Sequence, residues 1–181
     1  MKAAENTLPN RACFLRPELF ALSIGHAEEV NVTKLKKIIA PTDLSKLSRP
    51  AVGRALEMGV EQDAEVIVYH VISEDGDWFG KDDGLNPASA FVPQHQERLH
   101  EFVKENFADM IGKVRITEAV EAGIPYNKIV LKAEAENADM IVMSTHGRTG
   151  FEQIMLGSVT AKVVARASCP VLSIRPTKKN N

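Results

Sequence analysis

The sequence predicts an α/β protein in which a doubly wound, five-stranded parallel sheet carries helices on both faces. From Lys34 onward, short apolar runs alternate with longer amphipathic runs, which is the pattern of strands joined by crossover helices. A glycine-containing loop separates the fourth apolar run from the helical pattern after it. With 181 residues and 44% hydrophobic content, the chain is sufficient for one domain with one core.

The first half of the domain is expected to hold two strands, one helix and a long loop. Residues 35–40 are a short apolar run, and residues 41–43 form the turn that leaves it. A helix capped by Ser48 follows, because apolar residues then recur at four-residue spacing. Residues 65–72 are the second strand, and the polar stretch 73–92 is a loop. The apolar residues of the helix are Val52, Leu56 and Val60.

The second half continues the alternation. A helix is expected over residues 93–111, since its apolar residues fall on one face and its charges on the other. Residues 114–120 alternate apolar and polar, as in a strand that is less buried. Gly123 and Pro125 introduce the next helix. The apolar face of the first of these helices consists of Leu99, Phe102, Val103, Met110 and Ile111. The remaining elements are a helix to Asn137, a strand at 138–143, a helix at 158–167 and a strand at 170–174.

Composition argues against several partners and compartments. The formal charge of −2 and the pI of about 6.2 give no basic excess, so nucleic acid and anionic membranes are not expected partners. The two cysteines, Cys13 and Cys169, lie far apart in dissimilar contexts and imply no disulfide framework. Cys169 is expected to be a small core residue. A reducing, cytoplasmic location fits these features.

The chain divides into three parts. Residues 1–33 are an atypical N-terminal extension, residues 34–176 the domain, and residues 177–181 a polar tail. Arg16, Pro17 and Glu18 interrupt the apolar residues of the extension, so it resembles neither a signal peptide nor a membrane span.

The most informative segment runs from Ser144 to Thr160. Residues 138–143 predict a buried strand, and the segment Ser144-Thr145-His146-Gly147-Arg148-Thr149-Gly150 follows it. Gly157-Ser158-Val159-Thr160 then opens a helix. Glycines let the backbone approach an anion, and the amides at a helix N-terminus face it. This arrangement predicts phosphate binding, with a nucleotide as the natural ligand.

Other nucleotide-binding and catalytic motifs do not occur. The Walker pattern is missing, because Gly157 and not lysine precedes Ser158, and no Gly-x-Gly-x-x-Gly follows the first strand. A serine hydrolase elbow is also missing. Asp43 and His146 are the single plausible titrating pair, and both are assigned to binding.

The spacing of the loop resembles that of the universal stress protein family, whose nucleotide-binding members carry Gly-x2-Gly-x9-Gly followed by Ser or Thr. Gly147 and Gly157 match the second and third glycines, Ser158 matches the hydroxyl residue, and Ser144 replaces the first glycine. The resemblance covers about residues 34–176, including Ile38 to Asp43 and Cys169 to Leu172. It implies the strand order 3-2-1-4-5 and a homodimer formed through the strand from Pro170 to Arg175.

The resemblance also implies a site for ATP, accompanied by Mg²⁺. The residues at the end of the first strand would hold the nucleoside, with Asp43 near it and Thr42 and Pro41 shaping the turn. Val71 would pack against adenine, and Met143 would contact adenine or ribose. Arg148 would neutralise a terminal phosphate. The remaining phosphate contacts would come from Ser144, His146, Gly147, Gly157, Ser158, Val159 and Thr160.

Several of these residues have a purely structural alternative. Asp43 could make an Asx-type turn, and His146 could satisfy loop carbonyls. Arg148 could be solvated, while Ser158 could cap its helix and still contact phosphate. Histidines outside the loop are expected to have structural positions. His70 would be packed within its strand, and His95 and His100 would be solvated on a helix.

The sequence therefore predicts an ATP-binding stress protein that acts by nucleotide occupancy and not mainly by catalysis. The phosphate loop is accompanied by no dedicated nucleophile or base. Two alternatives stay open. The protein could be a slow ATPase that uses Arg148, or a nucleotide-free dimeric interaction module, since Ser144 departs from the family pattern.

Overall fold

The computed structural model describes residues 34–73, 88–145 and 157–176 of the chain. The N-terminal extension, the polar tail and most of the loop expected at 73–92 lie outside the described residues. The residues at the end of that loop are helical. A 3-10 helix, η2, spans Ala88–Phe91, and α2 begins at Val92.

Five parallel strands form one sheet in the order β3-β2-β1-β4-β5, which confirms the predicted fold class and strand order. β3 lies at an edge of this order and is less buried than β1 and β2, as its alternating sequence predicts. β5 lies at the other edge. The strands are β1 Lys37–Thr42, β2 Glu65–Ser73, β3 Arg115–Gly123, β4 Met140–Ser144 and β5 Val171–Ile174.

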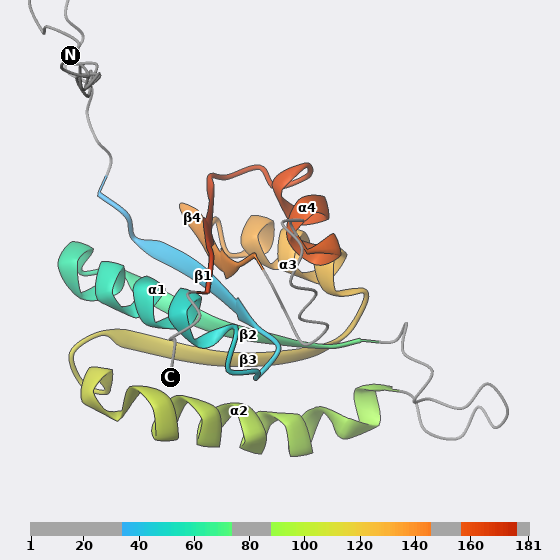
Figure 1. Ribbon diagram of the computed structural model, residues 1–181, viewed down its shortest axis with the longest axis horizontal. Coiled ribbons are helices and arrows are strands. Elements are labelled where there is room, and N and C mark those ends of the chain that lie inside the picture. Colours follow the sequence, from blue (N-terminus) through green and yellow to red (C-terminus); the bar gives the residue numbers. More distant parts are fainter. Residues whose placement is uncertain (1–33, 74–87, 146–156, 177–181) are drawn as a thin grey trace, which may run out of the picture. The chain divides into compact units, whose positions relative to one another are not determined.

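Helices cover both faces of the sheet (Figure 1). α1 and α2 pack on one face, and α3 and α4 pack on the other. Successive residues of a strand point to opposite faces, so Ile38 and Ala40 of β1 belong to the first core and Ile39 to the second. The helices are α1 Arg49–Gln62, α2 Val92–Phe107, α3 Pro125–Ala135 and α4 Ser158–Val164, with a second 3-10 helix, η3, at Ala108–Met110.

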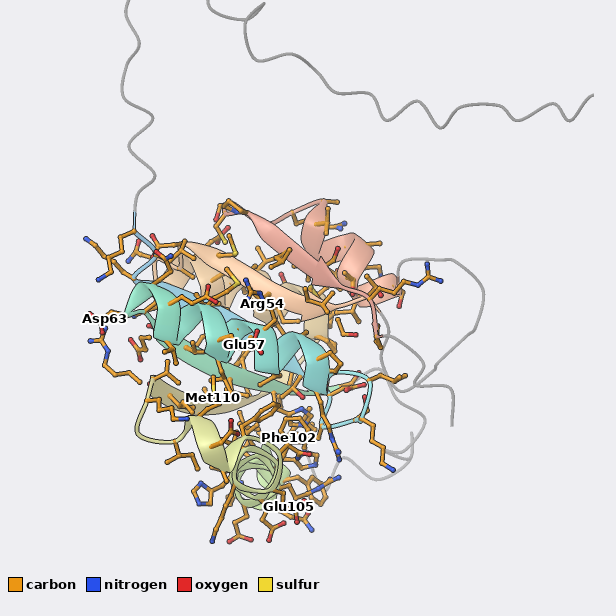
Figure 2. All side chains as sticks on the ribbon, turned by 60° about the vertical axis from the view of Figure 1, so that its left-hand side comes forward. Arg54, Glu57, Asp63, Phe102, Glu105 and Met110 are labelled. Atoms are coloured by element: carbon orange, nitrogen blue, oxygen red, sulfur yellow. The ribbon has the colours of Figure 1, made fainter. Side chains whose placement is uncertain are left out.

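α2 illustrates how an amphipathic sequence positions a helix. Its buried residues are Leu99, Phe102, Val103 and Phe107, which recur at three- and four-residue spacing. Figure 2 shows Phe102 on the side of α2 that faces the sheet and Glu105 on the opposite side. Burial of this stripe holds α2 against β2 and β3.

The sequence misplaces several element ends. Ile111 is 53% exposed and Val60 is 43% exposed, although both were expected on apolar helix faces. α2 already ends at Phe107, so residue 111 lies beyond the helix. Val60 lies in the last turn of α1, where the helical period continues after the core contacts end. β3 runs to Gly123 instead of Val120, because its ladder with β2 extends to the pair Ser73 and Gly123.

Candidate functional site

The two central strands diverge towards their carboxyl ends. The register of β1 with β4 consists of two pairs, Ile38 with Met140 and Ile39 with Ile141, although the strands continue to Thr42 and Ser144. β1 and β2, by contrast, are paired along the whole of β1. β1 and β4 also flank the point where the strand order reverses its direction. In doubly wound sheets such a point is where ligands bind, beyond the carboxyl ends of the strands.

The turn after β1 is fixed by a chain of hydroxyl groups. The Thr42 hydroxyl donates to Ser48 Oγ at 2.8 Å, because the Ser48 hydroxyl donates its own proton to the Ser45 carbonyl at 2.9 Å. Thr42 Oγ1 also accepts from the Leu44 amide at 3.0 Å. Leu44 takes a left-handed backbone conformation with φ of 64°. The bonds on Thr42 hold this conformation in place.

Hydrogen bonds near this turn test the roles expected for Ser48 and Asp43. Ser48 precedes α1 as expected, but its side chain makes no capping hydrogen bond to the helix, because its hydroxyl is engaged by Thr42 and Ser45. Asp43 Oδ1 accepts from the Ser45 amide at 3.0 Å, which confirms the Asx-type turn considered for it. A carboxylate has a second oxygen, so this turn is compatible with a ligand contact by the same side chain.

Ser144 links two segments at the carboxyl end of the sheet. It is the last residue of β4, and its hydroxyl donates to the Leu47 carbonyl in the loop before α1 at 2.9 Å. Glycine could not make this bond. The residue that departs from the glycine pattern therefore joins the end of β4 to the loop after β1.

The start of α4 lies close against the end of β4. The Gly157 amide donates to the Thr145 carbonyl at 2.9 Å, and the Thr160 hydroxyl donates to the Ser144 carbonyl at 2.8 Å. A Cβ atom at Gly157 would meet the Thr145 oxygen at 2.9 Å, so a side chain would collide with the protein backbone. The φ of Gly157 is −54°, which any residue adopts. Close approach, and not backbone freedom, is the reason for glycine here.

Three of the predicted site residues belong to one apolar cluster on the face that α3 and α4 cover. Met143 is buried in this cluster, and Val71 and Val159 are partly buried against it. Pro41 of β1 is also buried. The structure thus brings together residues from β2, β4 and α4 at one end of the sheet.

The phosphate end of the predicted site is described in part. His146, Gly147 and Arg148 lie outside the described residues. Ser158 is exposed and is the first residue of α4, whose N-cap is Gly157, so the cap role considered as an alternative for Ser158 is wrong. The amides of Ser158, Val159 and Thr160 belong to the first turn of α4, where the helix supplies no acceptor of its own.

The expected packing of His70 within its strand is confirmed, but the sequence does not predict its contact with His95. His70 is 4% exposed, and its Nδ1 lies 2.8 Å from the Thr42 carbonyl oxygen. Its Nε2 lies 2.9 Å from Nδ1 of His95 on α2. His95 was expected to be solvated, whereas it pairs with a buried ring; His100 is exposed as expected. The contact joins residues that are 25 positions apart on different elements, so no local sequence pattern predicts it.

A buried tyrosine belongs to the apolar cluster against which Val71 packs. Tyr69 is fully buried, and its hydroxyl has no hydrogen-bond partner of good geometry. Burial raises the pKa of Tyr69, and the negative charge of Glu121 raises it further. Glu121 is paired with Lys128, whose Nζ lies 3.0 Å from Oε2.

Within the described residues, no group of three or more His, Cys, Asp or Glu side chains could hold a metal ion. None of the helices described here combines the length and the apolar character needed to cross a bilayer.

The five-stranded parallel sheet with helices on both faces places the chain in the class of doubly wound α/β domains. The model of the universal stress protein family matches residues 34–175. The chain therefore belongs to the universal stress protein family, which confirms the resemblance in the sequence.

Individual relatives agree with this assignment. Universal stress protein MJ0531 of Methanocaldococcus jannaschii is 36% identical over 155 residues, which cover 80% of this chain and 84% of that protein. The solved structure of MJ0577 from the same organism is 29% identical with a TM-score of 0.67 and covers 81% of this chain and 99% of that one. A universal stress protein solved in complex with cAMP is 24% identical, has a TM-score of 0.59 and shares the fold over 79% of this chain and 98% of that one.

Proposed function

We propose that this universal stress protein binds ATP, accompanied by Mg²⁺, in the crevice between β1 and β4 and acts as a nucleotide-occupied switch in the stress response. The observation that carries the proposal is the divergence of β1 and β4 after Ile39 and Ile141. Three features converge there: the fixed turn after β1, the end of β4 and the first turn of α4. A family member of the same fold has been solved with cAMP, which is also an adenine nucleotide.

The described residues support a division of the site into two ends. Asp43 would hold the nucleoside, with Thr42 and Pro41 shaping the turn and with Val71 and Met143 as the apolar wall against the base. The amides of Ser158 to Thr160 would face phosphate, because the first turn of α4 offers them no acceptor, whereas the Gly157 amide is bonded to the Thr145 carbonyl. The Gly157 amide and the Thr160 hydroxyl also donate to the carbonyls of Thr145 and Ser144 at the end of β4. These two residues would therefore shape the site as well as line it. Ser144, His146, Gly147 and Arg148 complete the proposed contacts.

We further propose a cytoplasmic homodimer that forms through β5. This strand is an edge of the sheet, and a strand edge offers unpaired backbone groups to a second copy. Two identical edges related by a two-fold axis would pair as antiparallel strands.

Nucleotide extraction and titration test the function. Purified protein should release an adenine nucleotide on denaturation, identified by mass analysis. Calorimetric titration of nucleotide-free protein should show that ATP with Mg²⁺ binds more tightly than GTP. Protein that releases no nucleotide and gives no heat with ATP, ADP or AMP would favour the nucleotide-free module.

A matched variant separates the two roles of Asp43. Asp43→Asn keeps a side-chain oxygen that can accept from the Ser45 amide, but it removes the charge. If Asp43 contacts the nucleoside as a carboxylate, ATP affinity should fall about tenfold, or about 1.4 kcal/mol. Asp63→Asn is the control, because Asp63 lies at the end of α1 beside the amino end of β2. Equal affinities for both variants and wild type would remove Asp43 from the ligand contacts.

Turnover distinguishes the switch from an ATPase. A protein that signals by occupancy should release phosphate far more slowly than the roughly 10 per second of a typical enzyme. If phosphate release with Mg²⁺ instead reached the rate of a typical enzyme, and if Arg148→Ala abolished it, catalysis would be established.

A further inference from the structure

His70 joins the turn after β1 to helix α2. One nitrogen of its ring contacts the Thr42 carbonyl at 2.8 Å, and the other contacts His95 at 2.9 Å. The planes of the two histidine rings differ by 5°, and their centroids lie 5.1 Å apart. With nitrogens at hydrogen-bond distance and centroids this far apart, the rings meet edge to edge, which is the geometry of a hydrogen bond in the ring plane.

The hydrogen-bond partners determine which ring nitrogen carries the proton in each of the two contacts. A carbonyl oxygen can only accept, so Nδ1 of His70 carries a proton and donates to Thr42. In the neutral ring Nε2 of His70 then has a lone pair and must accept from His95. Nδ1 of His95 therefore carries the proton of the second bond. His95 on α2 thus donates to His70 on β2, and His70 donates to Thr42 at the end of β1.

The turn after β1, whose Thr42 carbonyl accepts from His70, is held in place by further hydrogen bonds around Thr42. Thr42 is 6% exposed, its hydroxyl is bonded to Ser48 and to the Leu44 amide, and its carbonyl is bonded to His70. Asp43 follows directly and is held by the Ser45 amide. The bonds on Thr42 thus hold the backbone that leads into Asp43, and the Ser45 amide holds its side chain.

We propose that His70 is a positioning residue for the nucleotide site, and that His95 sets its tautomer and thereby couples α2 to the turn that carries Asp43. The inference rests on the proposed nucleotide function, because it states how the β1 end of that site is held. Coupling of this kind is reciprocal. A change at the first turn of α2 alters nucleotide affinity, and nucleotide binding alters the hydrogen bond at the first turn of α2.

Two amide substitutions of His70 separate its two bonds. His70→Asn places a donor on the same carbon that carries Nδ1, so it can keep the bond to Thr42 while losing His95. His70→Gln places its amide near the position of Nε2, so it can keep His95 and loses Thr42. Both variants put an amide of similar polarity in the same buried site.

His95 has its own pair of variants. His95→Ala removes the donor to His70, whereas His95→Asn keeps a donor near the position of Nδ1. His100→Ala is the matched control on the same helix, because the His100 ring is exposed and lies beside Glu118 instead of a histidine.

Calorimetric titration with ATP and Mg²⁺ measures the effect on affinity. His70→Gln should weaken binding about tenfold, while His70→Asn should stay within about threefold of wild type. His95→Ala should weaken binding about threefold, and His95→Asn should restore it. Wild-type affinity in folded His70→Gln, or equal weakening in both His70 variants, would overturn the positioning role. Wild-type affinity in His95→Ala would overturn the coupling to α2.

Nitrogen-15 NMR of the wild-type histidines tests the tautomers without any substitution. At a pH where both rings are neutral, His70 and His95 should each be protonated at Nδ1. A proton on Nε2 of neutral His70 would overturn the proposal even if every variant failed to fold. A wild-type protein that binds no nucleotide would refute the proposed function and this inference together, whereas equal affinities among folded variants would refute the inference alone.

Discussion

The Thr160 hydroxyl on α4 donates a hydrogen bond of 2.8 Å to the backbone carbonyl of Ser144 at the end of β4, and both residues are buried. A buried carbonyl that loses its donor costs about 1–3 kcal/mol. Thr160→Val should therefore lower the free energy of unfolding by about that amount, whereas Thr160→Ser keeps the hydroxyl and should lose less. Urea denaturation measures both. Equal stability of Thr160→Val and wild type would mean that this bond makes no net contribution.

Gly157→Ala tests the close contact between α4 and β4. The added Cβ would lie 2.9 Å from the Thr145 carbonyl oxygen, so the start of α4 must shift away from the end of β4. We expect a loss of about 1–3 kcal/mol of stability and about a tenfold loss of ATP affinity. Thermal unfolding and calorimetric titration measure these losses.

Gly53→Ala is the control for this substitution. A Cβ at Gly53 would meet a Phe107 ring atom at 3.5 Å, an ordinary contact, and alanine favours the helix over glycine by about 1 kcal/mol. This variant should be as stable as wild type or more so and should bind ATP equally well. If both variants behaved alike, the collision at Gly157 would not be the cause.

Glu136 makes stability depend on acidic pH. Hydrogen bonds from Lys132 and then Lys37, at 2.8 and 2.7 Å, hold the pKa of Glu136 at about 2, below the ordinary 4.5. Because the folded pKa is lowered, the stabilisation is fully present above 4.5 and is lost as the pH falls from 4.5 towards 2. The group is partly exposed, so we expect only about 1 kcal/mol. Glu136→Gln should remove this part of the pH dependence in urea titrations at pH 7, 4 and 2.5.

Tyr69→Phe tests the cost of a buried hydroxyl. The Tyr69 oxygen has no hydrogen-bond partner of good geometry, so its removal should leave stability at pH 7 unchanged or raise it by up to about 1 kcal/mol. The raised pKa adds a second effect. Unfolded tyrosine ionises near pH 10 while folded Tyr69 does not, so wild type should lose stability as the pH rises through 10. A loss of more than about 1 kcal/mol at pH 7 in Tyr69→Phe would reveal a hydrogen bond to Glu121.

The sequence predicts the sheet well because each strand signal is local. The apolar runs mark β1, β2 and β4, although β1 begins and ends two residues later than expected. Asp43 and Gly157 are predicted for the site because each lies in a segment that resembles the family, the end of the first strand and the loop with spaced glycines. The bond from Ser144 to the Leu47 carbonyl spans 97 residues, and it exists only because the topology brings β4 beside the loop after β1. No periodicity or motif encodes such a contact, and the same holds for His70 and His95.

The backbone of β5 allows a selective test of the proposed homodimer. The carbonyl of Pro170 accepts a hydrogen bond from the Ile141 amide of β4, and that of Ile174 accepts one from the Thr145 amide directly after β4, at 2.9 Å in both cases. Backbone groups alternate in direction along a strand, so those of residue 172 also point to β4, whereas those of Val171 and Ser173 point to the open edge. A second copy would pair with Val171 and Ser173.

Ser173→Pro should therefore disrupt the dimer and leave the sheet intact. Proline removes the outward amide of Ser173, and such a substitution is tolerated on edge strands where that amide faces solvent. Leu172→Pro instead removes an amide that faces β4, so it should destabilise the domain itself. Light scattering at micromolar concentration should give a dimer for wild type and a monomer for Ser173→Pro, with unchanged circular dichroism for the latter. Monomeric wild-type protein would refute the dimer, and a Ser173→Pro variant that stays dimeric would place the interface elsewhere.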